Sequence, residues 1–299
     1  MIENRNCTTP SINLAIEEYA LRKLDCASDD YLFLYVNTPA VIVGKNQSIY
    51  KEINFDVLRK DIVNVYRRIS GGGTVYHDEG NLNFGFISKH EDFKVNNYKH
   101  FNQPIVSALI KAGISAEMDS RNNIVVDGKK VSGNAQFTNR KNILSHGTLL
   151  FNADLNVLRM ALRENEFDVE TKAVSSVRSS VMNLPATNLF SDIKRFKEYL
   201  IAALDAKQIL KFSDGEWAEI KKLAEEKFES YEWTFGRSPF TIIKKNGINI
   251  AVEEGLIKSM DGVDEFISTK LKGVPYKASE IKKALSNLPN AFQLTSLIF

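Results

Sequence analysis

Three consecutive glycines beside two arginines form the segment of this sequence with the clearest chemical use. The segment spans residues 67 to 86 and reads RRISGGGTVYHDEGNLNFGF. Because glycine has no Cβ, the backbone N–H groups of such a turn can approach a phosphate or carboxylate closely. Arg68 beside it could offer a planar, bidentate fork to the same anion. The pattern predicts an anion-binding loop, and the alternative is an ordinary glycine hairpin with solvent-facing arginines.

Two polar residues directly after this turn, His77 and Asp78, add to its possible chemistry. We favour a positional role for His77 over a role as a general base, because isolated histidines are more often structural. Asp78 could either cap the turn or hold a magnesium ion. No G-K-[ST] follows the glycines and their spacing is not G-x-G-x-x-G, which excludes the P-loop and dinucleotide-binding modes.

A second segment, VDGKKVSGNAQ at 126 to 136, reads as strand, D-G turn and strand. Alternation places Lys129 and Lys130 on opposite faces, so that one of them can face the interior or a cleft. An inward ammonium needs an anionic partner, and a bound carboxylate or phosphate would serve. Gly133 would let a ligand approach the backbone. The alternative is that both lysines are solvated at the hairpin.

Two further segments could complete a site. LSHGTLLFNADL at 144 to 155 reads as a strand that carries His146 and Thr148. TKAVSSVRSSVMNL at 171 to 184 is a polar loop with Lys172 and Arg178. It is either a linker or a substrate lid, and its composition does not choose between them.

The elements that must position these residues are predicted from periodicity. Helices are expected at 11–24 and 101–111. A helical stretch from about 154 to 229 contains three more helical segments, at 155–166, 191–207 and 215–230. Buried strands are expected at 31–36 and 40–44, joined by a turn, and further strands at 62–68, 81–88, 123–126, 131–137 and 144–152. We expect a mixed α/β domain over 1–242 and a small α+β domain over 243–299.

Composition limits the class of protein. The chain has 299 residues, with 39 Lys plus Arg against 37 Asp plus Glu and a formal charge of +2. Such balance argues against bulk binding of nucleic acid or of a membrane surface. Cys7 and Cys26 cannot build a disulfide framework. The N-terminus has no apolar signal region, and we expect a soluble cytoplasmic protein without tightly bound cofactor.

Taken together, these segments resemble the lipoate-protein ligase family over most of the chain. RRISGGGTVYHDEGNLNF is the most specific stretch. The resemblance continues through CTTPSINLAIEEYAL, YLFLYVNTPAVIVGKNQSIYKEIN, RNNIVVDGKKVSGNAQF, HGTLLFNADL, SVRSSVMNL and WTFGRSPF. KGVPYKASEIKKAL resembles the small accessory domain of the family, in a tail that is shorter than usual.

The resemblance implies a catalytic domain of the biotin and lipoate transferase type, distantly like class II aminoacyl-tRNA synthetases. It implies two steps: lipoate and ATP, as its magnesium complex, give lipoyl-AMP and pyrophosphate, and a lysine of an acceptor lipoyl domain then takes the lipoyl group. The implied acceptors are the E2 subunits of 2-oxoacid dehydrogenases and the glycine cleavage H protein. We expect a monomer.

The resemblance also implies roles for residues. Lys130 matches the ligase lysine that contacts the carboxylate and the adenylate phosphate, and His77 matches a histidine beside the dithiolane. Other positions match the enclosing loop or adenylate neighbours: Arg68, Ser70, Gly71, Gly72, Gly73, Thr74, Tyr76, Asn122, Gly133, Thr148, Lys172, Ser176 and Arg178. Asn123 departs from the family's Asn-Asp pattern, so no magnesium ligand is assigned there.

Rival functions remain at this stage. An octanoyl or lipoyl transferase of the same fold would need a cysteine nucleophile near the lysine, and we disfavour it because Cys7 and Cys26 both precede the glycine loop. A transferase that accepts preformed lipoyl-AMP would keep the same pocket. A biotin ligase is disfavoured because its G-R-G-R-x-G motif is missing. A non-enzymatic anion-binding protein requires the lysine and the glycine loop to be structural.

Overall fold

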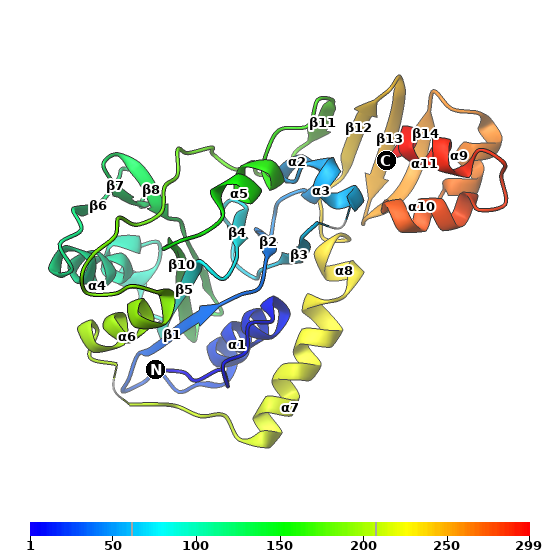
Figure 1. The fold of residues 1–299 in the computed structure, drawn as a ribbon. Helices are drawn as coiled ribbons and strands as arrows, with labels where there is room; N and C mark the ends of the chain where they lie inside the picture. The colour runs from blue at the N-terminus through cyan, green and yellow to red at the C-terminus, as the bar shows by residue number, and fades with distance from the viewer. Residues whose placement is uncertain (61, 207) are drawn as a thin grey trace.

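The computed structural model describes residues 1–60, 62–206 and 208–299. A large body contains most of the chain, and a smaller lobe at one end contains the C-terminus (Figure 1). Lys207, the last residue of the helix expected at 191–207, lies outside the described residues. Most expected elements are present, and their bounds shift by a few residues.

An antiparallel sheet in the order β1-β5-β10-β9 forms the centre of the large body. Its strands are β1 Tyr31–Val36, β5 Asn81–Lys89, β9 Asn134–Thr138 and β10 Asn142–Leu150. Every residue of β10 is buried, because β10 lies between two neighbours and is covered on both faces. The strand brings His146 and Thr148 into the middle of the molecule, where Thr148 lies opposite Asn83 of β5.

Helices cover both faces of this sheet. One hydrophobic cluster joins the sheet to α1 and α7, and another joins it to α4 and α6. In Figure 1, α1 and α7 lie to the lower right of the sheet, and α4 and α6 lie to its left. These helices are α1 Pro10–Lys23, α4 Tyr98–Lys111, α6 Ile193–Ala203 and α7 Asp214–Leu223, which continues into a π-helical turn at Ala224–Phe228. The shorter helices are α2 Ile49–Glu52, α3 Phe55–Lys60, α5 Leu155–Ala161, α8 Tyr231–Thr234 and a 3-10 turn at Asp92–Lys94.

A second sheet has the order β3-β2-β4, with β2 Ala40–Val43, β3 Asn64–Arg67 and β4 Val75–His77. The strands expected at 31–36 and 40–44 both form, but they belong to different sheets. The chain turns between them, and β2 pairs with β3 and β4 instead of β1.

A third sheet, β6-β7-β8, lies beside the central one. It comprises β6 Ala116–Met118, β7 Ile124–Val126 and β8 Lys129–Ser132. The expected D-G turn joins β7 to β8, with positive φ at Asp127 and Gly128. The single strand predicted at 131–137 is instead two strands, because the chain leaves the small sheet at Gly133 and joins β10 as β9.

The C-terminal lobe has the sheet β11-β12-β13-β14 and three helices. They are β11 Asp168–Thr171, β12 Thr241–Lys245, β13 Ile248–Glu253, β14 Leu256–Asp261, α9 Glu265–Leu271, α10 Ala278–Leu285 and α11 Ala291–Ile298. The boundary expected after residue 242 falls inside β12. One hydrophobic cluster runs from the lobe into β2, α2 and α3, so the lobe packs directly on the large body.

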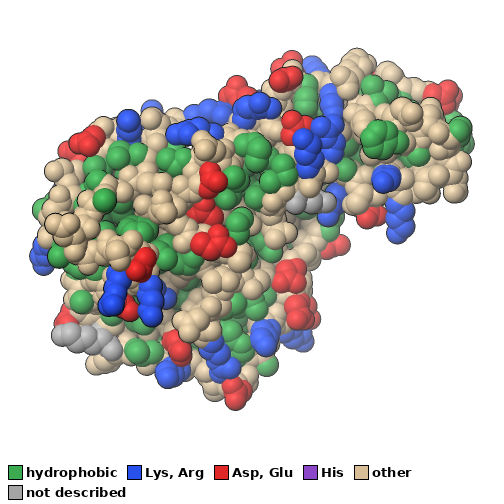
Figure 2. Space-filling view, viewed as in Figure 1, with side chains coloured by type: hydrophobic (Ala, Val, Ile, Leu, Met, Phe, Trp, Pro, Cys, Tyr) green, Lys and Arg blue, Asp and Glu red, His purple; other side chains and the backbone are tan. Residues whose placement is uncertain are grey.

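Acidic, basic and hydrophobic side chains are interspersed on the face shown in Figure 2. This agrees with the near balance of 39 basic and 37 acidic residues. Among the described residues, no helix is long and apolar enough to cross a membrane.

Candidate active site

The glycine loop crosses the end of strand β2. Strands β3 and β4 pair with β2 from opposite sides and do not pair with each other, so the loop is not the ordinary hairpin of the alternative prediction. It passes over Gly44, where an added Cβ would lie 2.1 Å from the carbonyl oxygen of Gly72. Gly72 itself has a φ of +84°, a conformation that favours glycine. Glycine is therefore required at both contacting positions.

Both arginines before the loop are buried, which excludes the solvent-facing alternative. The Arg68 guanidinium donates to the carbonyl oxygens of Gly71 at 2.6 Å and Gly73 at 2.7 Å. It also donates to Ile42 O at 3.1 Å and to Ser70 Oγ at 2.9 Å. Four of its five N–H donors are thus used within the protein. In this conformation Arg68 holds the loop in shape and does not present a free bidentate fork.

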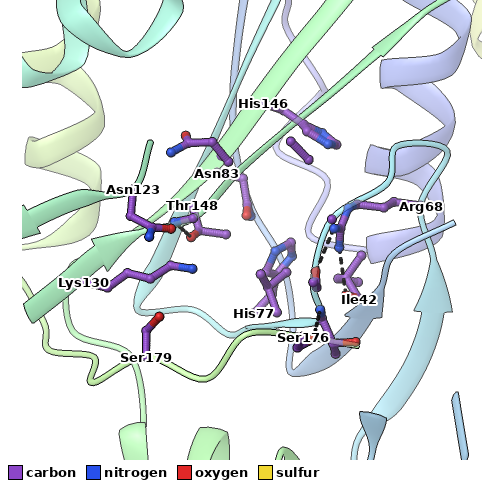
Figure 3. Close-up of a pocket in the computed structure, with 18 of the residues that line it drawn as sticks. Ile42, Arg68, His77, Asn83, Asn123, Lys130, His146, Thr148, Ser176 and Ser179 are labelled. Atoms are coloured by element: carbon purple, nitrogen blue, oxygen red, sulfur yellow. Dashed lines mark hydrogen bonds between the residues drawn. The ribbon is translucent and has the colours of Figure 1, made fainter. Parts of the chain in front are cut away.

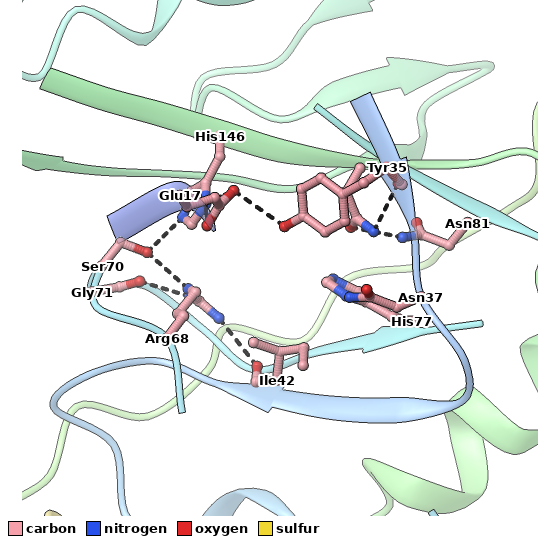
Figure 4. Close-up of polar contacts among 11 residues, drawn as sticks. Glu17, Tyr35, Asn37, Ile42, Arg68, Ser70, Gly71, His77, Asn81 and His146 are labelled. Atoms are coloured by element: carbon pink, nitrogen blue, oxygen red, sulfur yellow. Dashed lines mark hydrogen bonds and ion pairs between the residues drawn. The ribbon is translucent and has the colours of Figure 1, made fainter. Parts of the chain in front are cut away.

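A buried chain of polar contacts continues from Arg68 to the first helix (Figure 4). Ser70 Oγ lies 2.6 Å from His146 Nε2, and His146 Nδ1 lies 2.9 Å from both carboxylate oxygens of Glu17. The Tyr35 hydroxyl donates to Glu17 at 3.1 Å. Because Arg68 donates to Ser70 Oγ, the Ser70 hydroxyl is free to donate to His146. The loop is thereby connected to α1 through β10.

His77 lies between this network and the cavity. Its Nδ1 is 2.9 Å from Asn37 Nδ2, and because an amide nitrogen can only donate, His77 Nδ1 accepts this hydrogen bond. Burial, followed by the nearby Arg68 and His146, lowers the pKa of His77 to about 3. The ring is therefore neutral, which supports a positional role over general acid–base catalysis.

A cavity of about 410 Å³ opens beside the glycine loop (Figure 3). The cavity is lined by many of the residues predicted from the sequence, which come from β4, β8, β10, the glycine loop and the polar loop. These are Arg68, Gly72, Gly73, Thr74, His77, Lys130, Gly133, Thr148 and Ser176. The N–H groups of the three loop glycines donate to no acceptor among the described residues, so they remain available to an anion.

Lys130 points into this cavity, whereas Lys129 is exposed, as the alternation of the strand predicted. An added Cβ at Gly133 would lie 2.8 Å from Lys130 Nζ, so Gly133 makes room for the ammonium group. Among the described residues no carboxylate forms an ion pair with Lys130, although the charge of Asp119 raises its pKa. Burial lowers the pKa of Lys130. A half-buried cation without an ion-pair partner favours an anionic ligand.

Other predicted site residues lie outside this cavity. Tyr76 points to the opposite face of β4 and joins the cluster around α2. Ser70 and Gly71 bind Arg68 and do not line the cavity. Asn122 does not line it either, and its carbonyl oxygen accepts hydrogen bonds from Asn102 at 3.2 Å and Asn134 at 2.8 Å. Strand alternation and loop geometry explain these placements.

The two basic residues of the polar loop are also outside the first cavity. Arg178 is paired with Glu164 at 3.0 Å and lines a second cavity, which lies on the other side of the loop. Lys172 is exposed and lines neither cavity. The polar loop nevertheless contributes Ser176 to both cavities, which favours the lid alternative over the linker.

Asp78 caps the turn. Its Oδ1 accepts from the N–H of Gly80 at 2.9 Å and its Oδ2 from the N–H of Asp154 at 2.7 Å. Burial raises the pKa of Asp78. Both oxygens are occupied and Asp78 does not line the cavity, so the structure does not support the magnesium alternative. Among the described residues no group of three acidic, histidine or cysteine side chains could hold a metal ion.

Sequence reasoning missed several residues of the cavity wall. They include Leu14, Tyr35, Ile42, Arg121 and Asn134. The turn that carries Arg121 and Asn123 is fixed by Asp119, which accepts from both backbone N–H groups at 2.8 and 2.9 Å. A D-x-R-N-N turn after a strand was the available signal, because short polar turns of this kind are stabilised by Asp at their first position.

Comparisons with known proteins agree with this geometry. Residues 9–205 match the family described as lipoyl protein ligase A/B catalytic domain. The lipoate-protein ligase LplJ of Bacillus subtilis is 41% identical over 248 residues, which cover 80% of this chain and 74% of that protein. A crystal structure of lipoate-protein ligase A bound with ATP has a TM-score of 0.66 at 24% identity, covering 77% of this chain and 95% of that one. The P. falciparum LipL1 complex with lipoate has a TM-score of 0.64 at 22% identity and covers 99% of this chain and 98% of that one.

The match of residues 9–205 and the similarity to these relatives show that the chain belongs to the lipoyl protein ligase A/B family. Within that family it is a lipoate–protein ligase, like relatives of about 40% identity that match four fifths of its length.

Proposed function

We propose that this chain activates lipoate with ATP in the cavity beside the glycine loop and transfers the lipoyl group to a lysine of a lipoyl domain. In the first step, a carboxylate oxygen of lipoate attacks the α-phosphorus, the bond to the β-phosphate breaks and pyrophosphate leaves. In the second step, the neutral ε-amine attacks the acyl carbon, the acyl–oxygen bond breaks, AMP leaves and the nitrogen releases one proton to solvent. The unpartnered Lys130 ammonium, facing the cavity between Gly133 and the glycine loop, is the observation that carries this proposal.

Lys130 supplies the charge that the first step lacks. Lipoate and ATP are both anions, and the transition state concentrates negative charge on the phosphoryl oxygens. A fixed cation in a site of low polarity stabilises that charge, because no water must be reorganised at the moment of reaction. Gly72 and Gly73 of the glycine loop line the same cavity, and their N–H groups donate to no acceptor among the described residues. Lys130 acts here as an electrostatic clamp and forms no covalent bond.

The cavity also suits the acyl chain of lipoate. Three buried residues, Leu14, Tyr35 and Ile42, contribute apolar surface to its lining. Neutral His77 adds no charge there. A carboxylate held by Lys130 would leave the hydrocarbon chain to contact this apolar surface, which is how mixed polar and apolar pockets orient their ligands.

The thioester alternative finds no support. Cys26 is buried behind α1 and burial raises its pKa to about 11, while Cys7 packs against the same cluster. Neither sulfur lines a cavity beside Lys130. A reactive cysteine requires exposure and a lowered pKa.

Magnesium would enter with the phosphates of ATP, and the acceptors would be lipoyl domains of E2 subunits and the H protein.

The test is pyrophosphate release by the purified protein with lipoate and ATP, followed by a mass gain on the lysine of a lipoyl domain. We expect both, and both should depend on lipoate and ATP. Lipoylation only from synthetic lipoyl-AMP, without pyrophosphate release from ATP, would overturn the ligase proposal and leave a transferase.

A further inference from the structure

Residues 174–179, which we name the strap, form a partition between two cavities. The second cavity has a volume of about 540 Å³ and is lined by α5, β11 and the outer side of the strap. Thr74, Lys130 and strap residues such as Ser176 line both cavities. Figure 3 shows Ser176 and Ser179 along one edge of the first cavity, with Lys130 and His77 above them. If the strap moved away, the two spaces would become continuous.

Ser176 anchors the middle of the strap. Its backbone N–H donates to both carboxylate oxygens of Glu52, at 3.1 and 3.3 Å, and its hydroxyl donates to Glu52 Oε2. The same hydroxyl oxygen accepts from Gln47 Nε2 at 3.0 Å and from the N–H of Thr74 at 2.9 Å. Val174 and Val177 on either side are 60% and 67% exposed. The hold on this segment is therefore concentrated in one residue.

The far end of the strap is held differently. Lys130 N donates to the carbonyl oxygen of Ser180 at 2.9 Å, and Met182 N donates to Lys130 O at 3.0 Å. These backbone bonds tie the chain after the strap to β8. The strap can thus be released at Ser176 while its end remains attached beside Lys130.

Glu52 depends on the strap in return. It is the last residue of α2 and is only 9% exposed. Among the described residues its carboxylate forms no ion pair, and its hydrogen bonds are those from Ser176. Opening the strap would break all the hydrogen bonds that this carboxylate accepts from Ser176. Glu52 therefore favours the closed position of the strap through an interaction that opening must break.

We propose that Glu52 is a positioning residue that holds the strap closed through Ser176 and so shields the acyl adenylate from water. This inference rests on the proposed function. Water that reached the adenylate would attack the acyl carbon, break its bond to the phosphate oxygen and release lipoate and AMP. A closed strap separates that carbon from the wider second cavity until the acceptor lysine arrives.

Glu52→Gln tests this most gently, because it keeps the shape and one carbonyl acceptor but removes the charge that strengthens the bonds. Hydrogen exchange should accelerate about tenfold in the peptide that contains Ser176, with the rest of the protein unchanged. Ser176→Ala, which removes the hydroxyl alone, should show a smaller acceleration of the same peptide. Glu166→Gln is the matched control, since Glu166 is exposed on the same side and lines neither cavity.

The catalytic consequence is measured as AMP released per lysine lipoylated. With lipoate, ATP and a lipoyl domain, Glu52→Gln should release several-fold more AMP without lipoylation, while Glu166→Gln should match the wild type. Transfer from saturating synthetic lipoyl-AMP should keep its kcat. Unchanged exchange of the strap and unchanged coupling would overturn the role of Glu52, and so would a uniform rise in exchange with a lowered melting temperature. If the wild type releases no pyrophosphate, the proposed function fails. Hydrogen exchange of the strap still tests whether Glu52 holds it closed.

Discussion

The two cations that sequence analysis assigned to anion binding, Arg68 and Lys130, have opposite surroundings. Arg68 is buried beneath the glycine loop, and four of its donors bind groups of the protein. Lys130 is half-buried at the mouth of the cavity and forms no ion pair among the described residues. One cation builds the site and the other is left for the ligand. Residue type alone does not distinguish these roles; the location of the nearest acceptors does.

The largest effect on activity is expected from a substitution of Lys130. Lys130→Ala should reduce lipoate-dependent ATP–pyrophosphate exchange by about 10²–10³-fold, because it removes a preorganised charge from the transition state. The melting temperature should hardly change, since the ammonium makes no ion pair that the fold would lose. Lys129→Ala is the control and should retain full exchange. Full exchange in Lys130→Ala would remove this lysine from the site.

Arg68→Met should have the reverse profile, with its main effect on stability. The carbonyl oxygens of Ile42, Gly71 and Gly73 would lose their donor in a buried setting. The free energy of unfolding should fall by about 3 kcal/mol. Urea titration measures it, and Arg195→Met, at an exposed arginine paired with Glu198, should stay within about 0.5 kcal/mol of wild type. A stable Arg68→Met protein would show that the loop does not depend on this arginine.

A smaller effect is expected from Gly133→Ala, which sharpens the assignment of Lys130. The new methyl group would occupy the space of Nζ, 2.8 Å away, and push the ammonium out of position. Exchange activity should fall about tenfold, as expected for a displaced catalytic group. Gly215→Ala, where an added Cβ meets no atom within 4 Å, is the control. Equal activities of the two variants would contradict the placement of Lys130.

The pH dependence of kcat/KM for ATP should also report Lys130. Burial lowers the pKa of this lysine below its ordinary value of 10.5. Because the protonated form is the active one, a lowered pKa moves the loss of activity on the alkaline side to lower pH. The residual activity of Lys130→Ala should lack this decline. An alkaline limb that is the same in both proteins would assign the titration to another group.

The smallest effect is expected at His77, which lies between the two regions. Because its pKa is lowered to about 3, the ring stays neutral wherever the enzyme is active. His77→Gln should therefore leave the shape of the rate profile unchanged between about pH 5 and pH 8, where an ordinary histidine titrates. A limb lost in this variant would show that His77 carries a proton in the reaction.

Much of this site could be predicted from the sequence because its signals are local. The D-G turn and strand alternation predicted that one of Lys129 and Lys130 faces inward, and three glycines predicted a close backbone approach. We predicted Tyr76 at the site together with His77, but strand alternation places these neighbours on opposite faces of β4. The alternatives for Asp78 could be decided only by its long-range bond to Asp154.

The missing parts are those that depend on distant pairing. Strands 31–36 and 40–44 look like neighbours in sequence, yet only the pairing partners of β2 decide its sheet. Glu17 and His146 meet across 129 residues, and Ser176 meets Glu52 across 124. No local pattern indicates such contacts, because they are set by how α1, β10 and the strap pack around one cavity.

A crystal structure with a non-hydrolysable lipoyl-AMP analogue would test the central comparison most directly. We predict Lys130 Nζ within hydrogen-bond distance of a phosphoryl or acyl oxygen, and an Arg68 that still donates to Gly71 and Gly73. An analogue bound by a released Arg68, with Lys130 turned toward solvent, would contradict this account.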